Sequence, residues 1–189
     1  MPRGIRRLTC KISVIFLFAA GGQTPLGTAF IVGYPIPGSP DKAVPLVVTA
    51  KHVAGDHAKI VGRFTTKEGK TPAGVEYDLA ALRQAGDLWE HTDAGLDLVV
   101  FGTLHLEEAQ YSVIPLNLIA SKQTFAAQQI QSTDRVVWPG LRVNFMGSAR
   151  NYPVLRSGPV RSPWKVLPCA ISSPCTRGPF VTRLRQILP

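Results

Sequence analysis

Short apolar runs separated by turn residues dominate the first half of the chain. They occupy residues 12–20, 27–32, 45–50 and 58–64, and Val, Ile and Phe recur in them. Gly, Pro and Asp stand between the runs, as in Gly21-Gly22 and Gly55-Asp56. Short runs of β-branched and aromatic residues bounded by such turn signals are typical of β-strands. The pattern therefore predicts four strands by residue 64.

The pattern continues with less regular elements. Residues 75–79 form a weaker candidate strand and residues 96–101 a strong one, while residues 104–110 are expected to be a short helical or irregular connector. The Gly/Pro-rich residues 34–40 show no phosphate-loop pattern, and we expect a surface loop there.

A second group of predicted strands follows a polar stretch at residues 121–133. These strands cover residues 135–138, 141–146 and 153–156. Two successive β units, residues 12–110 and residues 111–158, are therefore expected in an all-β fold.

The chain changes character near Gly158. Its last 32 residues contain six prolines and two of the three cysteines, without strand alternation. Proline cannot donate a hydrogen bond to a strand ladder, so it breaks strands at this density. We treat residues 159–189 as an atypical Pro/Arg-rich tail.

The first apolar run has two interpretations. Arg3, Arg6 and Arg7 followed by residues 12–20 resemble the basic and apolar regions of a signal peptide, which would mean export. The run is too short to span a bilayer. Its β-branched and aromatic content favours a strand, because signal peptides are usually richer in Leu and Ala. The strand interpretation slightly favours a cytoplasmic location.

Composition supports a packed β protein. Of the 189 residues 45% are hydrophobic, the mean hydropathy is +0.10, and there are 17 Gly and 16 Pro. The formal net charge of +9 comes from the two ends, since residues 12–134 carry eight basic and twelve acidic residues. The basic tail also lacks regularly interleaved aromatic residues. A nucleic-acid partner is therefore not expected, and neither is a membrane span.

Cysteine and histidine do not indicate a metal or cofactor site. Cys10, Cys169 and Cys175 are too few for a disulfide framework, and free thiols are favoured over a pairing of the last two. His57, His91 and His105 fit no metal-binding motif. We expect no cofactor and no metal.

Two segments carry candidate chemistry. Thr49-Ala50-Lys51-His52-Val53 follows an apolar strand, and Asp97 stands at the mouth of the apolar residues 98–101. An acidic residue there is costly to bury without a hydrogen-bond partner. His52 and Asp97 are 97 − 52 = 45 residues apart. Asp93 is the alternative to Asp97, although in a loop it could instead cap a turn.

These segments resemble the amino-terminal barrel of trypsin-like (chymotrypsin-fold) serine peptidases, in the bacterial type of the family. The resemblance rests on residues 27–32, on the Thr-Ala-x-His-Val segment and on residues 89–101. It implies a double β-barrel, with His52 as general base and Asp97 as the carboxylate that orients it. It also implies a structural role for His91 beside Asp97. The second barrel is expected to be incomplete.

The family's serine motif is absent from the sequence. In the family the nucleophile lies in a Gly-x-Ser-Gly turn, whose backbone N–H groups stabilise the oxyanion. Ser157 is followed by only one Gly, and the glycine pattern is also absent around Ser162, Ser172 and Ser173. A nucleophilic Cys175 would need glycine after it, but Thr176 and Arg177 stand there. We hypothesise that the family's sequence ends near Gly158 through truncation or a frame shift. A Gly-x-Ser-Gly motif in another reading frame of the encoding DNA would support this.

The resemblance therefore predicts a serine-type endopeptidase that hydrolyses peptide bonds in a peptide or protein substrate and that is nearly inactive as written. The alternative is a non-catalytic, peptidase-like module that binds peptides or proteins. A small basic barrel that binds nucleic acid is a third hypothesis, which predicts affinity that falls steeply with salt. Substrate specificity and oligomeric state are not encoded in any recognisable pattern.

Overall fold

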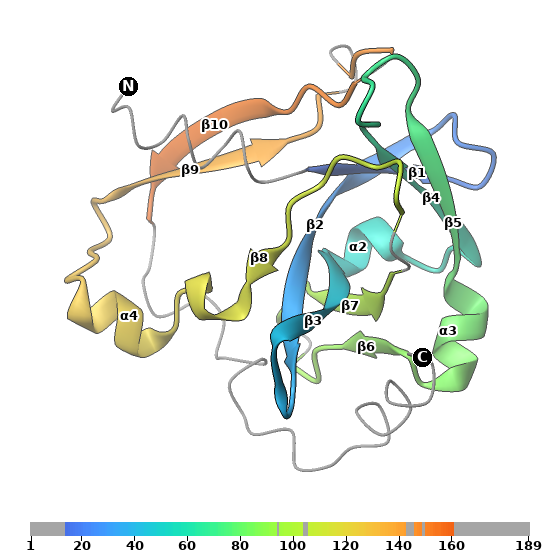
Figure 1. Ribbon diagram of the computed structural model, residues 1–189. Coiled ribbons are helices and arrows are strands. Elements are labelled where there is room, and N and C mark those ends of the chain that lie inside the picture. The colour runs from blue at the N-terminus through green and yellow to red at the C-terminus, as the bar shows by residue number, and fades with distance from the viewer. Residues whose placement is uncertain (1–13, 94, 104–105, 143–145, 149, 161–189) are drawn as a thin grey trace.

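The computed structural model describes residues 14–93, 95–103, 106–142, 146–148 and 150–160, and this part of the chain is mostly β (Figure 1). A large sheet has the strand order β5-β4-β1-β2-β3-β7-β6, with every neighbour antiparallel. Short β8 pairs with β2 in parallel, and β9 and β10 form a separate two-stranded sheet. The all-β prediction is confirmed at this level.

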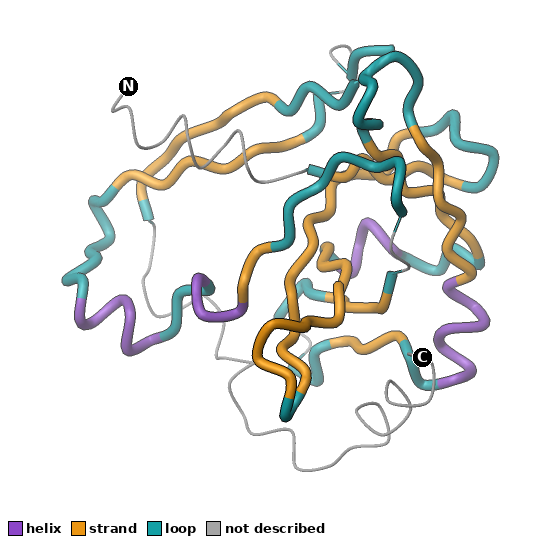
Figure 2. The backbone as a smooth tube through the Cα atoms, viewed as in Figure 1, coloured by secondary structure: helices purple, strands orange, loops and turns teal. Residues whose placement is uncertain are grey.

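The strands of the large sheet have the following bounds: β1 is Ile15–Ala19, β2 Pro25–Ile36, β3 Ser39–Thr49, β4 Lys59–Phe64, β5 Ala73–Asp78, β6 Leu88–Glu90, β7 Val99–Gly102 and β8 Ile114–Pro115. The remaining elements are β9 (Arg135–Gly140), β10 (Val154–Pro159), α2 (Lys51–Ala54), α3 (Leu79–Ala85), the 3₁₀ helix η1 (Leu116–Leu118) and α4 (Lys122–Ala127). The helices are short; α3 and α4 lie at the outside of the view, and α2 lies among the strands (Figure 2).

Both faces of the central strands are covered, which explains the nearly continuous apolar runs. The inner face forms the main core, with Leu17, Ile31 and Val47 among its fully buried residues. The opposite face carries a second cluster around Val48 and Val100, against which Leu116 and Ile119 pack. Strands buried on both sides do not need the apolar-polar alternation of a half-exposed sheet.

The large sheet is curled, so that strands far apart in its order meet. The rings of Tyr77 in β5 and Phe101 in β7 are 5.1 Å apart, and the Tyr77 hydroxyl shares a 2.8 Å hydrogen bond with Thr103 Oγ1. Burial raises the pKa of Tyr77 to about 12, so the phenol stays neutral in this contact. The curl brings the ends of the sheet together and encloses the main core.

Several local expectations need correction. Residues 34–40 are not a loop, because β2 continues to Ile36 and β3 begins at Ser39, leaving only a tight turn in which Gly38 has a φ of 80°. Glycine adopts this left-handed backbone without the penalty of a side chain. β6 and the helices α3 and α4 were not anticipated. Asp78 caps α3 by accepting from Ala81 N at 2.8 Å, and Ser121 begins a capping box on α4.

Other predicted strands are found with shifted bounds. The runs at residues 12–20 and 58–64 contain β1 and β4. The run at residues 75–79 overlaps β5, which begins earlier at Ala73, and the run at residues 135–138 overlaps β9, which continues to Gly140. The strong candidate at residues 96–101 begins later, at Val99. Residues 141–142 and 146 are not in a strand, and the rest of the candidate at 141–146 lies outside the described residues. Residues 12–13 and 161–189 also lie outside them. None of the described helices has the length and hydrophobicity to cross a bilayer.

The β9–β10 hairpin extends away from the large sheet, and the segment between its strands returns to β1 and β4 (Figure 1). Arg63 in β4 donates to Asn151 Oδ1 at 3.1 Å and to the backbone oxygens of Met146, Gly147 and Arg150. The Asn151 amide donates to Val14 O at 3.0 Å and to Arg63 O at 2.7 Å. This polar junction is the main attachment of the hairpin segment.

Candidate active site

The pairing of β3 with β7 brings His52 and Asp97 together. Thr49, the last residue of β3, lies opposite Val99, the first residue of β7. His52 lies three residues beyond Thr49, in α2, and Asp97 lies two residues before Val99. Because the strands are antiparallel, the end of one and the start of the other meet at the same edge of the sheet. Residues 45 positions apart in sequence thus become neighbours.

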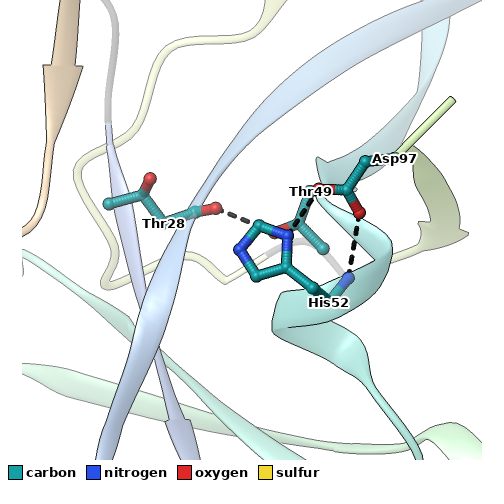
Figure 3. A network of polar contacts seen from close by, with 4 residues as sticks. All are labelled: Thr28, Thr49, His52 and Asp97. Carbon is teal, nitrogen blue, oxygen red and sulfur yellow. Dashed lines mark hydrogen bonds and ion pairs between the residues drawn. The ribbon is translucent and has the colours of Figure 1, made fainter. Parts of the chain in front are cut away.

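The Asp97 carboxylate contacts both the backbone and the ring of His52 (Figure 3). Its Oδ1 accepts a hydrogen bond from His52 N at 3.0 Å, and its Oδ2 pairs with His52 Nδ1. An ionised carboxylate can only accept hydrogen bonds, so Nδ1 carries the proton. In the neutral ring, Nε2 then has a free lone pair. This lone pair lets Nε2 accept a proton, as a general base must.

The pair is accessible to solvent. The side chains of His52 and Asp97 are 74% and 51% exposed. In the described part of the chain, Nε2 of His52 has no hydrogen-bond partner. The ring is therefore held on its Nδ1 side and open on the other.

Contacts with α2 also control the ionisation of Asp97. Its limited desolvation raises the pKa of the carboxyl, but the hydrogen bonds from His52 N–H and the His52 ring outweigh this effect. The positive charge of protonated His52 and the backbone N–H of Lys51 act in the same direction. The net result is a pKa below the ordinary value of 3.8. Asp97 is therefore an anion at neutral pH.

This lowered pKa predicts a pH-dependent contribution to stability. A carboxyl whose pKa is lower in the folded than in the unfolded state stabilises the fold above its unfolded pKa. The contribution of Asp97 is expected to be complete above pH 3.8 and to vanish as the pH falls through the lower, folded value. Urea unfolding of the wild type and of Asp97→Asn across this range measures it. Parallel pH profiles of the two proteins would contradict the assignment.

The chain around α2 holds His52 in place. Val53 is buried, and its side chain packs against Gly27 of β2. Thr49 Oγ1 donates to Thr28 O at 2.8 Å, which joins the start of β2 to the end of β3 beside His52 (Figure 3). After α2, Gly55 has a φ of 48°, and its carbonyl oxygen accepts from Arg83 of α3. Arg83 also donates to His57 O at 3.0 Å.

The loop before Asp97 is organised by His91, Asp93 and Lys51. His91 Nδ1 accepts from Asp93 N at 3.0 Å, and Asp93 Oδ1 accepts from Gly95 N at 2.8 Å. Lys51 Nζ donates to His91 O at 2.7 Å, which ties the loop to α2. Asp93 therefore caps a turn, whereas Asp97 is the carboxylate that contacts His52.

The described residues contain no cluster of three or more His, Cys, Asp and Glu side chains arranged for a metal ion. His57 lies beyond α2 beside Gly55, while His105 is outside the described residues. Ser157 lies in β10 and accepts from Arg135 at 2.9 Å. The other candidate nucleophiles and the three cysteines fall outside the described part: Ser162, Ser172, Ser173, Cys10, Cys169 and Cys175.

Sequence reasoning missed the residues that support the pair. Lys51 stands inside the motif that drew attention to His52, but its bond to His91 O depends on a residue 40 positions away. The roles of Gly27 and Arg83 likewise depend on which elements pack together. Capping by Asp93 was the one supporting contact that a local pattern suggested.

Comparison of the chain with protein-family models, with curated proteins and with solved structures finds no match.

Proposed function

We propose that this chain is a serine-type endopeptidase by lineage, with His52 as general base and Asp97 as the residue that orients it. In this proposal, the curled sheet corresponds to the first barrel of a chymotrypsin-like pair, and β9 and β10 belong to an incomplete second barrel. In this proposal the chain is nearly inactive as a peptidase, because its sequence has no recognisable serine motif.

One observation carries the proposal: the Asp97 carboxylate binds His52 through both the ring Nδ1 and the backbone N–H. A carboxylate held in this way fixes the ring tautomer, and it stabilises the imidazolium that forms when Nε2 takes a proton. This is the half of a catalytic triad that activates a nucleophile.

The chemistry follows from the two side chains. A hydroxyl placed at Nε2 would lose its proton to the ring as its oxygen attacks a peptide carbonyl, and the ring would then return that proton to the leaving amine. Water would release the acyl group by the same proton transfers in reverse. In the described part of the chain, neither a hydroxyl nor a thiol hydrogen-bonds to His52.

Hydrolysis of an activated ester, p-nitrophenyl acetate, tests the proposed base. We expect slow turnover without a burst of nitrophenol, because no acyl-enzyme accumulates on a missing serine. His52→Ala should lower the rate of ester hydrolysis to the background rate that the remaining histidines produce. Asp97→Asn should lower it about tenfold or more, because the amide does not stabilise the imidazolium. Release of nitrophenol, followed by its absorbance, measures all three proteins.

The control is His57→Ala, which removes a nearby imidazole without a carboxylate partner in the described structure. It should retain the His52-dependent rate. Equal rates in the wild type and in His52→Ala would contradict the proposed base. Covalent labelling by a fluorophosphonate that depends on His52 would instead show that a nucleophile is present and that the chain is an active peptidase.

A non-catalytic module that binds peptides is the second candidate. It is favoured by the two-stranded β9–β10 sheet, which has exposed apolar residues and, among the described residues, no further paired strand.

A further inference from the structure

Lys51 of α2 contacts the loop of residues 91–97 at both of its ends. Its side-chain Nζ donates to His91 O at 2.7 Å, where the loop begins. Its backbone N–H donates to the Asp97 carboxylate, where the loop ends, and helps to lower the pKa of that carboxyl. A single residue of the helix therefore spans the whole loop, and its side chain serves the end that lies farther from His52 in sequence.

Further hydrogen bonds join residues within this loop and close its base. His91 N donates to Leu98 O at 3.2 Å, which joins the two ends of the loop. Inside it, Asp93 N donates to His91 Nδ1 at 3.0 Å, and Gly95 N donates to Asp93 Oδ1 at 2.8 Å. These bonds fix the shape of the loop, but because they are internal they do not set its distance from α2. The side chain of Lys51 does so at the His91 end.

The position of Asp97 depends on such attachments because its side chain is poorly enclosed. The side chains of Asp97 and His52 are 51% and 74% exposed, so packing does not press them together. The strand β7 begins only at Val99, two residues after Asp97. An exposed ion pair contributes little free energy by itself, because water competes and the side chains lose entropy. The contact therefore needs a backbone that is held from elsewhere.

We propose that Lys51 is a positioning residue for the base: its side chain holds the loop of residues 91–97 at the distance from α2 at which the Asp97 carboxylate meets His52 Nδ1. The ammonium group is bound to the His91 carbonyl, so it acts through Asp97 and takes no part in proton transfer. For its effect on rate this inference rests on the proposed function. The position of Asp97 is a property of the resting structure and is measured without activity.

Nitrogen NMR of the full chain, labelled at its histidines, tests the position of Asp97 directly. At about pH 9 an ordinary histidine is neutral, and the hydrogen bond at one ring nitrogen decides which nitrogen carries the proton. In the wild type we expect His52 to carry it on Nδ1, and His52→Ala identifies the signals of this ring. Lys51→Met has no donor for the His91 carbonyl, so its His52 should lose the Nδ1–H form in favour of the Nε2–H form.

Two further lysine variants are the controls for this measurement. Lys51→Arg keeps the positive charge and a donor for the His91 carbonyl, so it should retain the Nδ1–H form of His52. Lys59→Met makes the same change of charge in β4, at a lysine whose Nζ donates to Glu76 Oε1 at 2.7 Å. It removes a bond of the same length outside the loop and should leave the His52 ring unchanged.

The rate of p-nitrophenyl acetate hydrolysis tests the route by which Lys51 acts. Lys51→Met should lower the His52-dependent rate about fivefold, which is less than the loss in Asp97→Asn, because the carboxylate is displaced but not removed. In the Asp97→Asn background the same change should have no further effect, since a residue that acts through Asp97 then has nothing to position. Lys51→Arg should recover most of the rate.

Two results would overturn the role of Lys51. One is an unchanged His52 tautomer in Lys51→Met, and the other is a double variant with Asp97→Asn in which the two rate losses multiply, which would mean that Lys51 acts on the ring or the ester directly. Failure of the proposed function gives a different pattern. The wild type and His52→Ala would then hydrolyse the ester equally, while the tautomer change in Lys51→Met would still show that this side chain positions Asp97.

Discussion

Arg63→Ala is expected to lower the free energy of unfolding by about 3 kcal/mol and to release the segment that carries β9 and β10. The guanidinium of Arg63 donates to Asn151 Oδ1 and to three backbone oxygens of residues 146–150. Its Cζ also lies 6.0 Å and 5.9 Å from the ring centres of Phe16 and Phe18. One side chain therefore connects the large sheet to the hairpin segment. Urea unfolding measures the stability loss.

Limited proteolysis gives the second measurement for this variant. Cleavage within residues 140–154 should accelerate in Arg63→Ala before the large sheet unfolds, because the segment loses its attachment. Arg63→Lys is the control, since it keeps the charge but not the planar set of donors, and it should recover only part of the loss. Asn151→Ala should be non-additive with Arg63→Ala, because the two side chains share one network. Unchanged cleavage in Arg63→Ala would refute this role.

Gly27→Ala is expected to destabilise the protein by about 2 kcal/mol and to displace α2, which carries His52. A Cβ on Gly27 would lie 2.6 Å from Cγ2 and 2.9 Å from Cγ1 of Val53. Both methyls of the stiff, β-branched valine meet the new atom, so a change of rotamer does not relieve the clash. The helix must move instead. The His52–Asp97 contact should loosen with it.

Val53→Ala in the same chain provides the rescue for this prediction. It removes both methyls, so the double variant should be more stable than the sum of the two single losses implies. The pKa of Asp97, followed by carbon NMR of its carboxyl, reports on the site itself. It should rise in Gly27→Ala and fall again in the double variant, because the hydrogen bonds from His52 lower it. Additive stability losses would exclude a direct clash between the two positions.

The strands illustrate how far local patterns reach. The β-branched and aromatic runs predicted β1, β3 and β4 because apolar residues are buried on both faces of β1 and of the end of β3, while β4 buries Ile60 and Phe64 on one face. The hairpin of β2 and β3 was missed at residues 34–40, where three prolines and a glycine indicate a turn but do not show how tight it is. α3 escaped notice because its seven residues bury only Leu79 fully, so it lacks an apolar stripe.

The candidate site also has features that local sequence predicted and features that only the strand pairing decided. His52 and Asp97 could be proposed from their local segments, because an acidic residue before an apolar strand requires a partner. That they contact each other follows from the register of β3 and β7, which places Thr49 opposite Val99. Asp93 and Asp97 are four residues apart and chemically identical. Only the course of the loop decides that one caps a turn and the other binds the imidazole.

The sequence by itself determined the β class of this protein, the position of its apolar strands and the identity of the two residues that form the candidate site. These features depend on side-chain chemistry and on spacing within a few residues. The tertiary structure alone decided that Lys51 holds the Asp97 loop, that Gly27 leaves room for Val53, and that Arg63 attaches the hairpin. Each of these contacts joins residues at least 26 positions apart, and the strand pairing that brings them together is a property of the whole packed chain.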